Sequence, residues 1–162
     1  MFEVSPRLNF MKLFFDNRPR AFAEIHGDAE YFDIFGDVYF YEVLSGGILI
    51  EAEIFGLPDA GRLEPPVFYA FHIHETGDCS DDFEHTGGHY NPKNRKHPMH
   101  EGDLPPLIAG HGYAWMSFYD PVLELHQIIG RSVVLHREAD DFTTQPAGNS
   151  GKKIACGVIK LI

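Results

Sequence analysis

The chain has 162 residues, and its 24 Asp and Glu residues outnumber its 13 Lys and Arg residues, which gives a formal net charge of -11. A chain of this length fits one domain that can bury roughly two thirds of its unfolded surface. The acidic balance argues against nucleic acid and anionic membranes as partners, because both require a basic footprint. No apolar run approaches the roughly 20 residues that span a bilayer, so no membrane partner is expected.

The first segment in chain order, residues 1–19, is rich in phenylalanine but shows no clean hydrophobic period. It lacks the basic start and the uninterrupted apolar stretch of an export signal. We interpret it as an N-terminal extension of unknown role, either an arm that packs on a neighbour or a poorly ordered tail. One domain is expected to follow over residues 20–162.

Short segments rich in Val, Ile, Phe and Tyr make up most of this domain, and helical periodicity is nearly absent. The segments are residues 21–26, 37–43, 48–55, 66–74, 113–119, 132–136 and 155–162. The sequence SGG before the third segment predicts a hairpin, and Ile48, Ile50 and Ile54 alternate there with Glu51 and Glu53. Short strands without intervening helices predict an antiparallel sandwich or barrel.

Three histidines belong to these predicted strands. In FHIH the strand period of two places His72 and His74 on one face, and Phe71 and Ile73 on the core face. In SVVLH the same period turns His136 away from the core. Two imidazoles at positions i and i+2 can reach a common metal ion, so these residues are candidate ligands.

Two loops supply further candidates. The sequence GGHYNP predicts a tight loop that carries His89, and KHPMHEGD spaces His97, His100 and Asp103 three residues apart. Pro98 and the Asn and Gly residues nearby disfavour a helix there. Two imidazoles and one carboxylate match zinc ligands, but a tetrahedral site needs a fourth donor. The remaining histidines are interpreted as solvated or hydrogen-bonded residues: His26, His85, His111 and His126.

The two cysteines, Cys79 and Cys156, do not form a CxxC motif, which excludes thiolate zinc fingers and thioredoxin-like redox sites. By themselves they are most simply interpreted as two free buried thiols.

Five motifs taken together resemble the copper, zinc superoxide dismutases, in the order that this family shows: FHIHETGDC, GGHYNP, KHPMHEGDL, IIGRSVVLHREADDF and GNSGKKIACGVI. The resemblance runs from about Arg20 to the C-terminus. It implies an all-β fold, a Greek-key β-barrel flattened like an immunoglobulin sandwich, for which this family is a known example. About eight antiparallel strands and long metal-binding and electrostatic loops are expected.

The resemblance also implies the roles of individual residues. Copper would be held by His72, His74, His89 and His136, and zinc by His89, His97, His100 and Asp103, so that His89 bridges the two metals. Asp140 would hydrogen-bond His72 and His97 and so fix the orientation of both rings. Cys79 and Cys156 would form a disulfide, with Cys79 placed as in bacterial members of the family, whose short zinc loop this chain shares.

The implied activity is disproportionation of the superoxide anion to dioxygen and hydrogen peroxide through a copper redox cycle, with His89 also delivering a proton. Lys153 stands where the family has an arginine that binds the anion. Lysine keeps the charge but lacks the planar fork, so we expect weaker anchoring of the substrate. For Lys152 and Lys153, a role in guiding the anion is only slightly favoured over the interpretation as a pair of solvated surface charges.

Other functions and settings are left open by the sequence. One alternative is a noncatalytic copper and zinc protein on the same fold. Another is a zinc hydrolase, which needs an open coordination position and a general base such as Glu75 or Glu84. A homodimer is compatible with the resemblance. The implied disulfide favours an oxidising compartment, whereas the missing export signal favours the cytoplasm.

Overall fold

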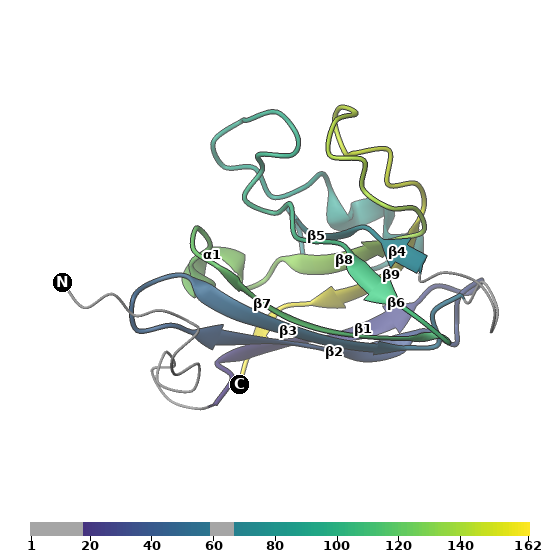
Figure 1. The fold of residues 1–162 in the computed structure, drawn as a ribbon, viewed down its shortest axis with the longest axis horizontal. Coiled ribbons are helices and arrows are strands. Elements are labelled where there is room, and N and C mark those ends of the chain that lie inside the picture. The colour runs from purple at the N-terminus through teal and green to yellow at the C-terminus, as the bar shows by residue number, and fades with distance from the viewer. Residues whose placement is uncertain (1–17, 59–66) are drawn as a thin grey trace.

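The computed structural model describes residues 18–58 and 67–162, and it shows the all-β fold that the sequence predicts (Figure 1). The strands are β1 (Ala21–Gly27), β2 (Phe35–Glu42), β3 (Ile48–Phe55), β4 (Val67–Tyr69), β5 (Phe71–His74), β6 (Leu107–Ala109), β7 (Tyr113–Asp120), β8 (Ser132–His136), β9 (Lys153–Val158) and β10 (Lys160–Leu161). A 3-10 helix, η2 (Asp81–Thr86), and a short helix, α1 (Leu125–Ile128), are also present. No helix in these ranges is long and apolar enough to cross a membrane.

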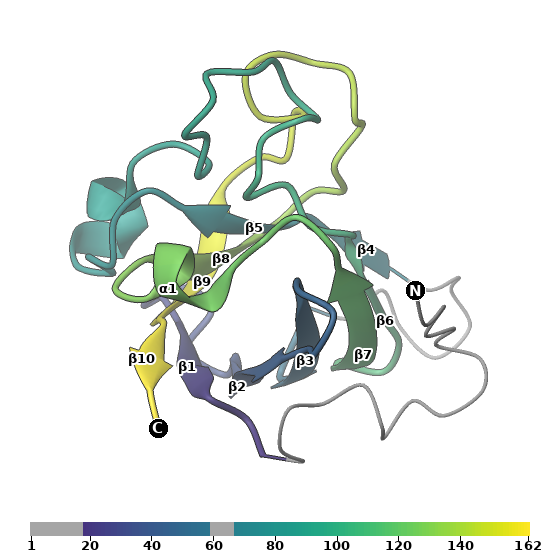
Figure 2. The same cartoon turned by 90° about the vertical axis from the view of Figure 1, so that its left-hand side faces the viewer.

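The strands form one curled antiparallel sheet and a small ribbon. The sheet has the order β5-β8-β9-β1-β2-β3-β7, with β10 added beside β1, and β4 pairs with β6. Figure 2 shows the sheet curving around the core, with the β4–β6 ribbon between β5 and β7. Sheet neighbours that are distant in sequence, such as β3 with β7 and β1 with β9, are the crossovers of the predicted Greek-key barrel. The N-terminal extension lies almost wholly outside the described residues, so its role stays a prediction.

The predicted hairpin is formed by β2 and β3, which pair along their whole lengths. Its turn contains Gly46 and Gly47 with φ values of 91° and 74°, a conformation that glycine adopts without a Cβ clash. The alternating isoleucines of β3 face the core, as expected. Leu49, on the opposite face, is also buried, because Val43 packs against it.

The segment at 66–74, predicted as one strand, is divided at Ala70 into β4 and β5, which belong to different sheets. The division has a clear backbone cause. Ala70 accepts a hydrogen bond from the backbone N–H of His136 and donates one to the carbonyl of Glu138, so the chain there changes its partner from β6 to β8. This corner places FHIH on the sheet edge, beside β8.

Two long loops, residues 75–106 and 137–152, lie together over the β5 and β8 end of the sheet in both views (Figures 1 and 2). They cover the outer face of β5, and all four of its residues are therefore buried. Side chains that the strand period turns away from the core consequently enter a second buried region between the sheet and the loops.

A disulfide joins the first of these loops to the sheet. Cys79 and Cys156 are bonded, which corrects the interpretation as free thiols and agrees with the implication of the family resemblance. Cys156 lies in β9 and packs with Phe83 of η2 and with Val134 of β8. The bond therefore fastens the segment that precedes His89 to the sheet.

Removing this disulfide is expected to lower stability. Replacing both cysteines by alanine should reduce the free energy of unfolding by about 4 kcal/mol, because a bond spanning 77 positions restricts the unfolded chain. Urea denaturation of matched metal-free samples measures this decrease. The wild-type protein with its disulfide reduced should show the same decrease in the free energy of unfolding. An unchanged urea midpoint in both samples would contradict the prediction.

Candidate metal centre

Seven side chains meet between the loops and the sheet, in two clusters that share His89. The first contains His72, His74, His89 and His136, and the second contains His89, His97, His100 and Asp103. Within each cluster, one potential ligand atom of every residue lies within 4.8 Å of the others. The structure thus gathers the ligand candidates predicted from the sequence, and both clusters are compatible with metal binding.

The strand period places the first cluster. In β5, Ile73 faces the core while His72 and His74 turn toward the loops. His136 reaches them from the end of β8, where a register shift follows Leu135. Because of this shift His136 pairs with Lys153, and a cationic side chain starts directly beside the cluster.

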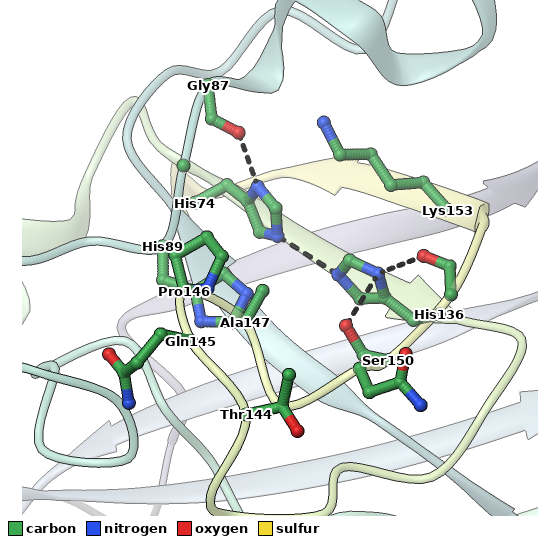
Figure 3. Close-up of a pocket in the computed structure, with 13 residues that line it drawn as sticks. His74, Gly87, His89, His136, Thr144, Gln145, Pro146, Ala147, Ser150 and Lys153 are labelled. Atoms are coloured by element: carbon green, nitrogen blue, oxygen red, sulfur yellow. Dashed lines mark hydrogen bonds between the residues drawn. The ribbon is translucent and has the colours of Figure 1, made fainter.

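His74 and His136 face one another through their Nε2 atoms, which are 3.2 Å apart (Figure 3). The Nδ1 atoms of these rings lie 3.0 Å from the carbonyl of Gly87 and 3.2 Å from that of Gly151. A carbonyl can only accept, so each Nδ1 carries the proton and each Nε2 presents a lone pair. Two facing lone pairs repel one another unless a cation lies between them.

Burial keeps these rings neutral, which is the form that binds metal. Desolvation lowers the pKa of His74 well below its ordinary value, and the neighbouring His136 adds to this effect. Desolvation, assisted by the nearby His72, also lowers the pKa of His136 to about 3. At neutral pH His74 and His136 are therefore uncharged nitrogen donors.

Asp140 connects the two clusters. His72 Nε2–H donates to its Oδ2 at 2.8 Å, and His97 Nε2–H donates to its Oδ1 at 2.9 Å. Burial acts to raise the pKa of Asp140, but hydrogen bonds from His72, from the backbone N–H of Phe142 and from His97 lower it to about 2. The Nδ1 atom of His72 is buried without a hydrogen-bond partner among the described residues, as a ligand atom aimed at a metal would be. The Nδ1 atom of His97 also makes no hydrogen bond there, although Asp103 Oδ2 lies 3.1 Å from it.

The second cluster is built on the loop that the sequence predicts to be non-helical, and no helix is found there. Asp103 Oδ1 lies 2.7 Å from His89 Nδ1 and 3.2 Å from His100 Nδ1, and its Oδ2 lies 3.1 Å from His97 Nδ1. Desolvation acts to raise the pKa of Asp103, but hydrogen bonds from His89 and from the backbone N–H of His100 leave it lowered. The opposite nitrogen of His89, Nε2, is buried without a hydrogen-bond partner among the described residues, so this ring can serve both clusters.

Gln145 is a supporting residue that sequence reasoning missed. Its Oε1 accepts from the backbone N–H of His97 at 3.0 Å, and its Nε2 donates to the carbonyl of the same residue at 2.7 Å. The two long loops are thereby joined at a candidate ligand. Nothing in the local sequence indicates this contact, because the partners are 48 positions apart.

A pocket of about 430 Å³ opens beside the first cluster, lined by His74, His136, Lys153 and the loop residues around 144–151 (Figure 3). Lys153 is the cationic side chain on its wall. Its Nζ donates to Thr86 Oγ1 at 2.8 Å and to the carbonyl of Phe83 at 3.1 Å, and burial lowers the pKa of the amine.

Lys152 takes another direction. Its Nζ lies 2.8 Å from Asp28 Oδ2 and 2.7 Å from Glu30 Oε2, and these hydrogen bonds raise its pKa. The sequence did not distinguish a guiding role from solvated charges for these two adjacent lysines. The structure separates them: Lys153 lines the pocket, whereas Lys152 pairs with the buried Asp28 and the exposed Glu30.

The remaining candidates lie outside both clusters. The four histidines interpreted as solvated or hydrogen-bonded are exposed: His26, His85, His111 and His126. Glu75 and Glu84, considered as general bases of a hydrolase, are exposed as well. Glu75 accepts a hydrogen bond from the backbone N–H of Gly88, so its carboxylate is used to support the loop before His89.

Comparisons with known proteins agree with this arrangement. The family model for copper/zinc superoxide dismutase (SODC) matches residues 34–159, a range that contains both clusters. Superoxide dismutase [Cu-Zn] 1 of Aquifex aeolicus is 36% identical over 132 residues, which are 72% of this chain and 75% of that protein. Superoxide dismutase [Cu-Zn] 3 of Arabidopsis thaliana is 34% identical over 158 residues, 88% of this chain and 90% of that one.

The solved structure of a double mutant of a superoxide dismutase-like protein from Bacillus subtilis is also similar. It has a TM-score of 0.74 and 31% sequence identity, and the match covers 85% of this chain and 95% of the other.

Proposed function

The chain belongs to the copper/zinc superoxide dismutase family, and on that premise we propose that it disproportionates superoxide. Two superoxide anions and two protons would give one dioxygen and one hydrogen peroxide. The observation that carries the proposal is the pair of deprotonated Nε2 atoms of His74 and His136, which face each other at the wall of a pocket that carries Lys153. This arrangement joins a nitrogen-donor cluster to an anion-attracting cation.

The donor atoms distinguish the two clusters. Four imidazole nitrogens suit Cu(II), and three imidazole nitrogens with one carboxylate oxygen suit tetrahedral Zn²⁺. We therefore assign copper to His72, His74, His89 and His136, and zinc to His89, His97, His100 and Asp103. Copper bound there would supply the one-electron couple that oxidises one superoxide and reduces a second.

The protein's own residues would bind the anion and deliver a proton. Lys153 presents a positive charge in the pocket of a chain whose net charge is -11, so the local attraction must act against the overall repulsion. His89 Nε2, the ring nitrogen opposite the one beside Asp103, is buried without a hydrogen-bond partner among the described residues, and this atom can hold a proton and pass it to reduced oxygen. Asp103 stabilises the same ring through Nδ1.

The test is to load the protein with copper and zinc, measure the content of both metals, and follow the decay of a pulse of superoxide. Protein loaded with zinc alone is the matched control. Decay that is accelerated in proportion to bound copper is the expected result. Full copper occupancy without acceleration would overturn the enzymatic proposal and leave a noncatalytic metal-binding protein on the same fold.

Lys153→Arg is expected to increase kcat/KM. A guanidinium can offer two parallel hydrogen bonds to an anion, and one additional bond corresponds to about a two- to fivefold faster capture. The initial slope of rate against superoxide concentration measures the change. Lys152→Arg is the control, because Lys152 is bound to Asp28 and Glu30 and should leave the slope unchanged. An equal or lower slope for Lys153→Arg would contradict the prediction.

A further inference from the structure

We propose that Thr86 is a positioning residue for anion capture, which holds the ammonium of Lys153 so that one of its N–H groups points to the anionic substrate. The inference rests on the proposed function, because it specifies how the same pocket binds its anion. It concerns a threonine in the sequence HTGGH, which precedes His89 and received no role from the sequence.

The hydrogen bonds at Lys153 are the first observation. A lysine ammonium has three N–H donors. Two of them are used within the described part of the chain, by Thr86 Oγ1 at 2.8 Å and by the carbonyl of Phe83 at 3.1 Å. One donor is left for the pocket. Figure 3 shows the Lys153 chain extending along the pocket wall, with its nitrogen on the side of Gly87 and His74.

The hydroxyl of Thr86 is oriented to accept from this ammonium. The Thr86 side chain is fully buried, and its own O–H donates to the carbonyl of Phe83 at 2.9 Å. That bond uses the hydroxyl proton and leaves the oxygen lone pairs for Lys153 Nζ. Thr86 Oγ1 also lies 3.3 Å from Nδ1 of His74, so the same side chain contacts the cation and a candidate copper ligand.

The segment that carries Thr86 is anchored to the sheet. Phe83, whose carbonyl accepts from both Thr86 and Lys153, has its ring packed on Cys156 and Val134, with Cys79 beside them. The disulfide therefore fastens the acceptor pair to β9, the strand from which Lys153 itself extends. The two acceptors and the Lys153 ammonium are therefore all attached to the same strand, the acceptors through the disulfide and Lys153 through the chain itself.

A lysine needs such support more than an arginine does. Its ammonium sits on a flexible stem with several rotatable bonds, and ordering that stem during binding reduces affinity. A side chain already held by two acceptors has lost this freedom before the anion arrives. Thr86 thus compensates in part for the missing guanidinium fork, by fixing the direction of a single N–H.

The test compares Thr86→Val, Thr86→Ser, Lys153→Met and the double variant Thr86→Val/Lys153→Met. Azide is the anionic probe, titrated against copper- and zinc-loaded protein and followed by visible absorption, which requires no turnover. Thr86→Val should weaken azide binding about fivefold, the usual net effect of losing one hydrogen bond. Thr86→Ser should restore it. In the Lys153→Met background, Thr86→Val should cause no further change.

A further loss in the double variant would mean that Thr86 acts through His74, and it would overturn the proposal.

A second readout does not depend on copper. The readout is the exchange of the Lys153 ammonium protons with water, followed by ¹⁵N NMR in zinc-loaded protein. This exchange should be slow in the wild type and in Thr86→Ser, and fast in Thr86→Val. Unchanged exchange would overturn the positioning role even where superoxide turnover is normal, whereas changed exchange without turnover would overturn only the enzymatic proposal.

Discussion

Substituting Asp140 by asparagine is expected to weaken metal binding by about 10- to 100-fold at the cluster whose imidazole then faces the amide NH₂, the usual effect of losing the group that orients a ligand imidazole. Asp140 accepts from Nε2–H of His72 through one carboxylate oxygen and from Nε2–H of His97 through the other. Asparagine has one acceptor oxygen, so its amide NH₂ would face the N–H of one of the two rings. That ring must rotate or change its tautomer, and either change moves the Nδ1 lone pair away from its cluster.

The measurement is competition with chelators of known affinity, carried out separately for copper and for zinc. Asp141→Asn is the matched control. Asp141 lies in the same loop and accepts hydrogen bonds from the backbone N–H groups of Thr143 and Thr144, not from either imidazole. It reports the effect of loosening the loop alone. If Asp140→Asn weakened metal binding no more than Asp141→Asn does, the orienting role of Asp140 would be refuted.

The strand pattern was informative because local sequence determines which way a strand residue points. The alternation in FHIH predicted that His72 and His74 share a face away from Ile73, and the structure places them so. The same pattern could not predict that this outer face is buried, because the cover comes from loops at residues 75–106 and 137–152. Nor did it reveal the corner at Ala70, which is set by the carbonyl and N–H groups of β8 and the residues after it.

Supporting residues were the least predictable part of the centre. Gln145 and Thr86 act through hydrogen bonds to groups that are 48 and 67 positions away, and each is an unremarkable polar residue in its own segment. The separation of Lys152 from Lys153 was equally hidden. It arises from the register shift after Leu135 and from Asp28, a buried carboxylate at the end of the neighbouring strand.

Replacing His136 by alanine is expected to abolish copper-dependent disproportionation of superoxide and to leave zinc binding intact. The substitution removes the Nε2 atom that faces His74 Nε2 at 3.2 Å, and with it one of the four nitrogens assigned to copper. His136 takes no part in the second cluster, so the zinc site keeps all four donors. The removed ring is neutral at pH 7, since its pKa lies near 3 as a consequence of burial, and no buried charge is left without its partner.

Three measurements on the same preparation decide the result: zinc content, copper content and the decay of a superoxide pulse. The expected outcome is full zinc occupancy, reduced copper occupancy and decay of superoxide at the rate seen in buffer alone.

His126→Ala, which removes an exposed imidazole outside both clusters, controls for loss of a histidine and should behave as wild type. Added imidazole can enter the space beside the pocket, and partial recovery of activity with it would place the defect at the lost nitrogen. Wild-type activity in His136→Ala would instead refute the assignment of copper to this cluster, because it would show that activity does not need the His136 nitrogen.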